Sequence, residues 1–227
     1  MNPEISVVIP AYNESLVLKN TLRKVREHRP HEIIVVDGGS TDRTTSIAEA
    51  EGVRVIRSKK GKYAQMNIGA QKATGNILWF LHADSAVGPA GYRSMEDSMA
   101  QNGRVGGAFA LKIDSQKRSL LFISLVANWR SRILGLAYGD QGIFVRSDIF
   151  RKMGGYAKLP ICEDLDFFRR MKKEGEVKLL EEEALVSSRR WAEEGTLYTT
   201  FRNTLIAGFF LIGIPPRWFS RWYGVIR

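Results

Sequence analysis

Acidic and polar side chains gather directly after three apolar runs of the sequence. Pro10-Ala-Tyr-Asn-Glu14 follows the first run, Asp37-Gly-Gly-Ser-Thr-Asp42 follows the second, and His82-Ala-Asp84 follows another. Carboxylates in such a cluster could hold a nucleotide or a divalent cation. Turns and helix caps explain any one of these loops equally well, because they favour Asn, Asp and Ser. Three such loops, each at the end of an apolar run, favour a functional site.

The elements that must position these loops follow from the pattern of apolar residues. Short apolar runs predict buried strands over residues 5–9, 32–37, 53–56 and 76–81. Amphipathic spacing predicts helices between them, over residues 14–26, 42–50 and 62–73. This alternation indicates an α/β fold with a mostly parallel, Rossmann-like sheet and helices on both faces. Ligands of such sheets bind beyond the carboxyl ends of the strands, where the three polar loops fall.

The second half of the sequence is less regular and contains apolar helices. We expect helices over residues 91–101, 118–136, 163–173 and 196–214, strands over residues 105–113 and 184–187, and a turn with a short strand over residues 139–145. There are no repeats and no linkers rich in Pro, Gly or Ser. We therefore predict one domain over residues 1–227, with helices at its C-terminal end.

Composition and charge narrow the class of protein. Hydrophobic residues make up 44% of the chain, which excludes wholesale disorder. The single cysteine, Cys162, cannot form an internal disulfide and is typical of a reducing compartment, so we expect a cytoplasmic protein. The longest uncharged stretch, residues 203–216, is 14 residues long. A bilayer span needs about 20 residues, so no transmembrane helix is predicted.

The net charge of +10 suits a polyanionic partner: nucleic acid, an anionic membrane or a phosphorylated small molecule. Against nucleic acid, the basic residues are dispersed and the strand ends are acidic. The usual nucleotide motifs are absent, since no GxGxxG follows the first strand and no GxxxxGK[ST] occurs. The run Lys59-Lys-Gly-Lys62 precedes a helix and suits a diphosphate, but a solvated charge run is the commoner explanation.

Six motifs in order carry a resemblance to a known family. They are Ile5-Ser-Val-Val-Ile-Pro-Ala-Tyr-Asn-Glu14, Ile33-Ile-Val-Val-Asp-Gly-Gly-Ser-Thr-Asp42, Phe80-Leu-His-Ala-Asp84, Gly139-Asp-Gln-Gly-Ile-Phe144, Glu163-Asp164 and Arg189-Arg-Trp191. Over about residues 4–191 the chain resembles a family 2 glycosyltransferase with a GT-A fold. The resemblance implies a nucleotide-sugar-binding half over residues 4–113 and an acceptor and catalytic half over residues 114–195.

The resemblance also implies a donor site at the first two loops. The positions that match nucleoside contacts in the family are Pro10, Ala11, Tyr12, Glu14, Asp37 and Gly38. Asp37 matches a carboxylate that accepts a hydrogen bond from the base, and a turn role before Gly38 is the alternative.

A divalent cation, Mg²⁺ or Mn²⁺, is implied at Asp84. This residue matches the last acid of the family's DxD metal motif, and the cation would neutralise the leaving diphosphate. The sequence departs from the motif because His82 stands where the first acid would be. We expect His82 to be a packed or supporting residue, and a metal-ligand role is the alternative. The metal prediction therefore depends on one carboxylate and on substrate phosphates.

The remaining motifs match the catalytic and acceptor side of the family. The resemblance implies that Asp164 is the base that takes the acceptor proton and that Glu163 assists it. Acids at a helix N-terminus also offset the helix dipole, which is the alternative. The further positions expected near the acceptor or a phosphate are Gln141, Gly142, Arg190 and Trp191. Asp140 is equally well explained as a companion acid or as a turn residue, and Ser187 replaces the family's Gln.

The function that these motifs predict is inverting transfer of a sugar from a nucleoside-diphosphate sugar to a hydroxyl acceptor, lipid-linked or polysaccharide. The alternatives are a nucleotidyltransferase, a non-catalytic binder of sugar nucleotides and, less favoured, a nucleic-acid-binding module. Residues 196–227 form an apolar helix with a basic, aromatic tail. This segment suits peripheral contact with an anionic membrane, packing on the domain or a homodimer interface.

Overall fold

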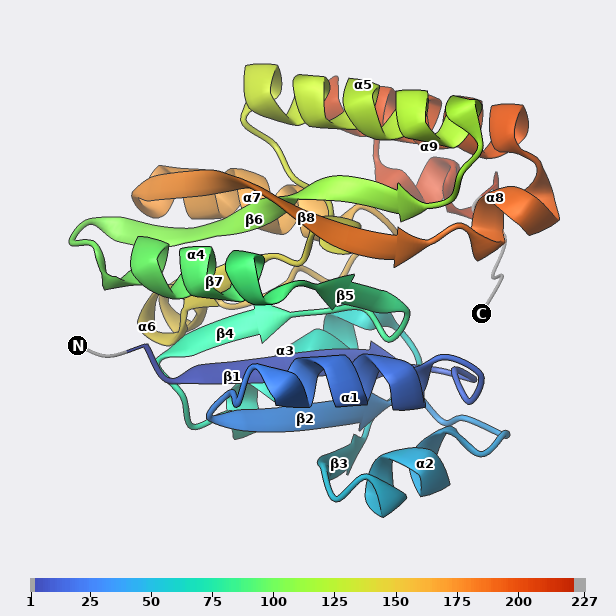
Figure 1. The fold of residues 1–227 in the computed structure, drawn as a ribbon. Coiled ribbons are helices and arrows are strands. Elements are labelled where there is room, and N and C mark those ends of the chain that lie inside the picture. The colour runs from blue at the N-terminus through green and yellow to red at the C-terminus, as the bar shows by residue number, and fades with distance from the viewer. Residues whose placement is uncertain (1–2, 223–227) are drawn as a thin grey trace.

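The computed structural model describes residues 3–222 of the protein. Within these residues, eight strands form one twisted sheet (Figure 1). The strand order is β3-β2-β1-β4-β7-β6-β8-β5. The strands are β1 (Ile5–Ala11), β2 (Glu32–Asp37), β3 (Arg54–Arg57), β4 (Ile77–Phe80), β5 (Ser85–Val87), β6 (Arg104–Asp114), β7 (Phe144–Arg146) and β8 (Glu176–Ser187).

The sheet is mixed rather than uniformly parallel. Strands β3, β2, β1 and β4 are parallel neighbours, as the alternation of strands and helices predicts. Strand β7 runs antiparallel to both β4 and β6, and β5 runs antiparallel to β8. Strands β6 and β8 are parallel to each other. The α/β fold is therefore confirmed, with antiparallel pairs in the second half of the sheet.

Helices cover both faces of the sheet (Figure 1). They are α1 (Leu18–Glu27), α2 (Thr44–Ala50), α3 (Lys62–Lys72), α4 (Pro89–Ala100), α5 (Arg118–Leu134), α6 (Ser147–Lys152), α7 (Glu163–Glu174), α8 (Arg189–Glu194) and α9 (Thr196–Leu211). Helices α1 and α4 pack on one face and α3, α6 and α7 on the other. Successive strand residues point to opposite faces, so Trp79 joins the first core and Phe80 the second. Burial on both faces is why these strands read as unbroken apolar runs.

The largest difference from the sequence prediction is β8. Only residues 184–187 were expected to form a strand, but β8 begins at Glu176. The run Glu181-Glu-Glu183 contains no apolar residue, so it interrupts the apolar pattern from which a strand would be predicted. In the fold, Glu183 lies 2.6 Å from the Lys112 ammonium and Glu182 accepts a hydrogen bond from Ser94. The short elements β5, α6 and α8 were not predicted either.

The domain boundaries stay a prediction. The C-terminal segment expected over residues 196–227 contains α9 and two short 3-10 turns, Pro216–Trp218 and Ser220–Trp222. Residues 223–227 of that segment lie outside the described residues.

Candidate active site

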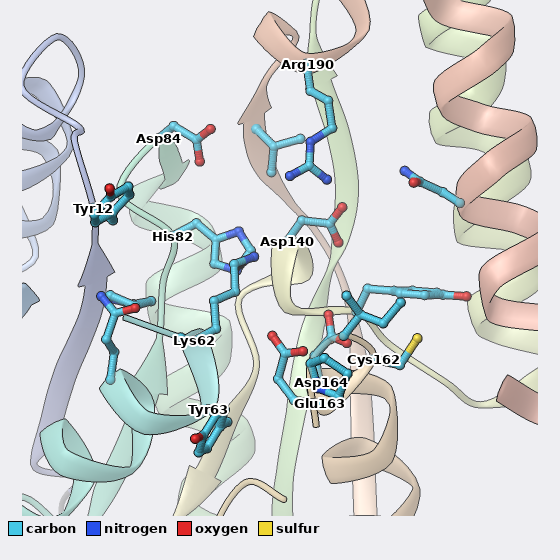
Figure 2. Close-up of a pocket in the computed structure, with 18 of the residues that line it drawn as sticks. Tyr12, Lys62, Tyr63, His82, Asp84, Asp140, Cys162, Glu163, Asp164 and Arg190 are labelled. Carbon is cyan, nitrogen blue, oxygen red and sulfur yellow. Dashed lines mark hydrogen bonds between the residues drawn. The ribbon is translucent and has the colours of Figure 1, made fainter. Parts of the chain in front are cut away.

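A cavity of about 610 Å³ lies at the carboxyl ends of β1 and β4, where the sequence predicts a site. Figure 2 shows that its walls come from segments far apart in the chain. One end is lined by the loop after β1 and the other by the start of α7 and by α9. The predicted site residues that the structure brings together here are Pro10, Ala11, Tyr12, Glu14, Asp84, Glu163, Asp164, Arg190 and Trp191.

The loop after β1 is held in place by charged contacts. Glu14 is buried and accepts a hydrogen bond from Arg189 Nη2 at 2.9 Å. The Lys60 ammonium lies 3.8 Å from the centre of the Tyr12 ring. Glu14 therefore contacts the start of α8 through Arg189, a residue 175 positions away in the sequence. Glu14 is a residue whose sequence motif predicts a nucleoside contact, whereas no such role is predicted for Arg189.

Asp37 and Gly38 lie beside the cavity and do not line it. The Asp37 carboxylate accepts hydrogen bonds from the backbone N–H groups of Gly39 and Ser40 at 3.0–3.1 Å. These are the contacts of the turn role that the sequence left open. Gly38 donates its N–H to the Ala11 carbonyl, which fixes the end of β2 beside the end of β1.

The segment that follows β4 carries His82 and Asp84, two side chains of types that can bind a metal ion. His82 Nε2 lies 3.4 Å from the Lys62 ammonium. Within residues 3–222, no group of three or more His, Cys, Asp or Glu side chains could hold a metal ion. Mg²⁺ is often bound by one or two carboxylates together with substrate phosphates. This donor set therefore fits a cation that is shared between Asp84 and a diphosphate, and it does not fit an all-protein cage.

Lys62 is a site residue that the sequence analysis underrated. It was expected in a solvated charge run, but it lines the cavity in the first turn of α3 and lies among His82, Asp140 and Glu163 (Figure 2). A helix N-terminus and a lysine together offer positive potential to a phosphate. In the sequence, the basic run 59–62 directly before a helix was the pattern that could have indicated Lys62 as a cavity residue.

The carboxylates of Asp140, Glu163 and Asp164 lie close together at the other end of the cavity. Glu163 and Asp164 open α7, directly after Cys162, whose φ of 62° is left-handed. Asp164 Oδ2 accepts a hydrogen bond from the Gly139 N–H at 2.6 Å, and its Oδ1 accepts one from the Leu165 N–H at 2.7 Å. The fit is tight, because a Cβ at Gly139 would lie 3.1 Å from Asp164 Oδ2 and would require a small shift of that carboxylate.

Crowding of these acids changes their protonation. Burial, and then the charge of Asp164, raises the pKa of Glu163 to about 7, and Lys62 opposes the shift. The same two causes raise the pKa of Asp140 to about 6, with Lys62, Arg130 and Arg190 opposing. The Asp164 carboxylate accepts its hydrogen bonds from two backbone N–H groups. Glu163 is therefore readily protonated near neutral pH.

Replacing Glu163 by Gln is expected to stabilise the protein at alkaline pH. The unfolded chain ionises this carboxyl near pKa 4.5, whereas the folded protein retains the proton up to about 7. The free energy of unfolding therefore falls as pH rises from 4.5 through 7. The effect is on the order of 3 kcal/mol, so Glu163→Gln should raise Tm by several degrees at about pH 8 and leave it unchanged at about pH 4. Thermal melts at both pH values test this, with the exposed Glu27→Gln as the control. Equal Tm differences at the two pH values would contradict it.

Gln141 and Gly142 have structural roles and do not line the cavity. Gln141 is 2% exposed. Its Oε1 accepts hydrogen bonds from the Tyr138 N–H and the Ser131 hydroxyl, and its Nε2 donates to the Phe109 carbonyl. Gly142 has a φ of 59°, which ends the 3-10 turn Gly139–Gln141 in the left-handed region. The Gln141 amide thus fixes the turn that carries Asp140, and the expected place of Gln141 near the acceptor stays a prediction.

Arg190 and Trp191 line the cavity as expected. The Arg190 guanidinium points toward Asp140 (Figure 2). Trp191 packs against the small apolar cluster of Leu111, Ile113 and Val186, so it supports the wall of the cavity. Ser187, which replaces the family's Gln, lies in the same wall.

The architecture around this cavity is a GT-A fold. Glucosyl-3-phosphoglycerate synthase from Mycobacterium tuberculosis, in complex with Mn²⁺, uridine diphosphate and glucosyl-3-phosphoglycerate, matches with a TM-score of 0.65 and 19% identity, over 94% of this chain and 81% of that one. TarS 1-349 of S. aureus in complex with UDP-GlcNAc also has a TM-score of 0.65, at 16% identity over 81% of this chain and 58% of that one. At these identities the likeness concerns the fold.

The chain belongs to glycosyl transferase family 2, whose family model matches residues 6–151. An uncharacterized glycosyltransferase of Mycobacterium tuberculosis (strain CDC 1551 / Oshkosh) is 30% identical over 179 residues, 73% of this chain and 64% of that protein. A PGL/p-HBAD biosynthesis glycosyltransferase of Mycobacterium bovis (strain BCG / Pasteur 1173P2) is 30% identical over 192 residues, 73% of this chain and 68% of that protein. The chain thus spans about two thirds of the length of these relatives.

Proposed function

We propose that the protein is an inverting glycosyltransferase that moves a sugar from a nucleoside-diphosphate sugar to a hydroxyl acceptor. The observation that carries the proposal is that different kinds of residue line the two ends of the cavity. The loop after β1 lines one end, the crowded acids at the start of α7 line the other, and Lys62 lies between them. A nucleotide at the first end would place its sugar toward the acids. The nucleotide ligands of the two GT-A structures above support a donor of this class.

The donor end is proposed to bind the nucleoside through the loop Pro10–Glu14 and through Asp37. Tyr12 offers an aromatic face at the cavity wall. The Asp37 carboxylate has about four acceptor sites, and its turn uses three hydrogen bonds, which leaves capacity for a ring N–H of the base. Lys62 and Arg190 are proposed to contact the diphosphate, since both cations line the cavity.

A divalent cation, Mg²⁺ or Mn²⁺, is proposed to bind at Asp84. When bound there, it would act as a Lewis acid that stabilises the negative charge of the leaving diphosphate. The Mn²⁺ in the glucosyl-3-phosphoglycerate synthase complex supports this choice. Asp84 is the one carboxylate of the chain that is proposed to hold it, and His82 remains beside Lys62 as a supporting residue.

Asp164 is proposed to take the proton of the acceptor hydroxyl. Its two backbone hydrogen bonds fix the carboxylate at the cavity wall, where it can accept a proton as a general base does. The deprotonated oxygen then attacks the anomeric carbon on the face opposite the diphosphate, so the anomeric configuration inverts. Glu163 is proposed to contact the acceptor, because its raised pKa of about 7 leaves it partly protonated at neutral pH and able to donate a hydrogen bond.

The acceptor is proposed to be presented at a membrane, as a lipid-linked or polysaccharide hydroxyl. The wall of the cavity near α7 and α9 is apolar, with Leu159, Ile161, Ile206 and Ala207 among its residues. Such a wall suits the apolar part of an acceptor better than a free sugar. The chain is accordingly proposed to contact an anionic membrane peripherally, and the cytoplasmic location stays a prediction.

Donor turnover tests the proposal without knowledge of the acceptor. We expect that, in a panel of nucleoside-diphosphate sugars with Mn²⁺, one donor is consumed slowly with water as the acceptor and releases nucleoside diphosphate. Proton NMR of the anomeric signal, recorded before mutarotation, should show the configuration opposite to that of the donor. Retention of configuration would contradict the inverting mechanism. Release of pyrophosphate from a nucleoside triphosphate and a sugar phosphate would instead identify a nucleotidyltransferase.

A further inference from the structure

The outward side of α5 exposes an apolar stripe. The stripe consists of Leu121, Phe122, Leu125, Val126, Trp129 and Ile133. Their spacing of three and four residues places them along one side of the helix, while Leu120, Ser124 and Ser131 of the same helix are buried. Leu125 and Trp129 are each 66% exposed. Single exposed apolar residues are ordinary, but a continuous stripe of this kind marks an interaction surface.

Helix α9 extends this stripe. It packs beside α5 at the end of the molecule farthest from α2 and β3 (Figure 1). Its first turns expose Leu197, Tyr198 and Phe201, of which Leu197 is 87% exposed. We call these three residues and the six of the stripe the α5–α9 surface.

The segments that carry the α5–α9 surface bear only basic charges, and the acid Glu181 of β8 lies 3.5 Å from one of them, Arg132. Residues 115–139 and 195–227 contain no Asp or Glu. Lys117, Arg118, Arg132 and Arg217 are exposed within these segments. Such a border complements anionic lipid headgroups. In a symmetric dimer, the same surface of both copies would bring these cations toward one another, which disfavours a second copy as the occupant.

The α5–α9 surface and the cavity share a helix. Helix α9 carries Leu197 and Phe201 on the surface, and it lines the cavity with Asn203, Ile206 and Ala207. Docking through this surface would place the α9 wall of the cavity next to the headgroups. No helix within the described residues is long and apolar enough to cross a membrane, so the contact would lie in the interface.

We propose that the α5–α9 surface is a membrane-docking surface, in which α5 lies in the headgroup region of an anionic bilayer. The stripe on α5, rather than the C-terminal tail, makes the main contact. The link to the acceptor rests on the proposed function, since it assumes that the apolar wall of the cavity receives a lipid-linked hydroxyl. The docking itself does not depend on sugar transfer.

Sedimentation of the full chain with vesicles tests the proposal. We expect wild-type protein to sediment with vesicles of phosphatidylcholine and phosphatidylglycerol, to do so less at high salt, and to remain in the supernatant with phosphatidylcholine alone. The double variant Leu125→Glu with Trp129→Glu should bind at least about tenfold more weakly. Two controls should bind like wild type: Leu16→Glu, whose leucine is 88% exposed away from the surface, and Trp218→Ser in the tail.

Several results would overturn the proposal. They are absence of wild-type sedimentation, unchanged binding of the α5 double variant, and an equal loss in either control. A wild-type dimer in analytical ultracentrifugation that becomes monomeric in the double variant, without vesicle binding, would assign the surface to a second copy. Unchanged thermal melting shows that the variant is folded. Vesicle binding by a protein that consumes no nucleoside-diphosphate sugar would retain the docking surface and overturn the proposed function alone.

Discussion

Replacing Asp164 by Asn is expected to lower kcat by about 10²–10⁴-fold, the usual contribution of a general base. Asn has nearly the same shape and retains one oxygen that can accept the Gly139 N–H. It has no charge and cannot take the proton of the acceptor hydroxyl. The affinity for the nucleoside diphosphate should not change, because Asp164 lies at the opposite end of the cavity from Tyr12 (Figure 2). Steady-state turnover and calorimetric nucleotide titration separate the two effects.

The same helix provides a matched control. Asp166 also lies in the first turn of α7, but its carboxylate pairs with Arg170 at 2.8 Å. Asp166→Asn therefore removes an acid of the same helix terminus outside the cavity, and kcat should remain close to that of wild type. Unchanged turnover in Asp164→Asn would remove Asp164 from the base role. If Glu163→Gln alone abolished turnover, the base would be Glu163, whose pKa of about 7 also suits proton transfer.

Replacing Asp84 by Asn is expected to lower kcat/KM for the donor by about 10²-fold or more. A Lewis acid at a leaving diphosphate contributes several kcal/mol, and each 1.36 kcal/mol corresponds to about tenfold in rate. An amide oxygen binds a divalent cation more weakly than a carboxylate. The remaining activity should depend less on Mn²⁺ than that of wild type. Mn²⁺ titrations of turnover in both proteins measure this difference.

Asp97→Asn is the control for charge alone. Asp97 lies exposed on α4 and does not line the cavity. Its replacement should leave both kcat/KM and the Mn²⁺ dependence unchanged. Wild-type turnover that survives complete chelation of divalent cations would contradict a metal at Asp84. In that case, Lys62, which lines the cavity beside His82, would be the cation that balances the diphosphate.

Local patterns were sufficient to predict most of the fold. Strand β2 was predicted with its observed bounds, because the apolar run 32–37 ends sharply at two glycines. The parallel half of the sheet followed from the alternation of strands and helices. The antiparallel half did not, because a run of glutamates at residues 181–183 interrupts the pattern of β8 and because β5 has only three residues. Pairing of such strands depends on tertiary contacts rather than on their own patterns.

The site was predicted where a motif in the chain places a residue directly at a strand or helix end. Asp84 and the pair Glu163–Asp164 are of this kind. The role of Arg189 could not be predicted, because it depends on the approach of two segments that are far apart in sequence. The burial of Gln141 could not be predicted for a related reason. A glutamine beside glycines suggests an exposed polar loop, whereas three tertiary hydrogen bonds bury its amide.

The apolar face of α5 shows a further limit of sequence patterns. The sequence predicts a wide apolar face over residues 118–136, and such a face usually packs on a core. In the structure, a narrow part of it packs on the end of β6 and β8, and the remainder is exposed. The pattern of residues is the same in both situations. Only the position of neighbouring elements separates a buried face from a docking surface.

Thermal melting with a panel of nucleoside-diphosphate sugars, with and without Mn²⁺, tests the central claim most directly. We predict that one donor raises Tm of wild-type protein by about 5 °C or more at a hundredfold excess over Kd, because ligand binding at that level contributes about 2.7 kcal/mol. The increase should require Mn²⁺ or Mg²⁺ and should be lost in Asp84→Asn. No increase with any donor, with or without the metal, would contradict the proposal that this cavity binds a nucleotide sugar.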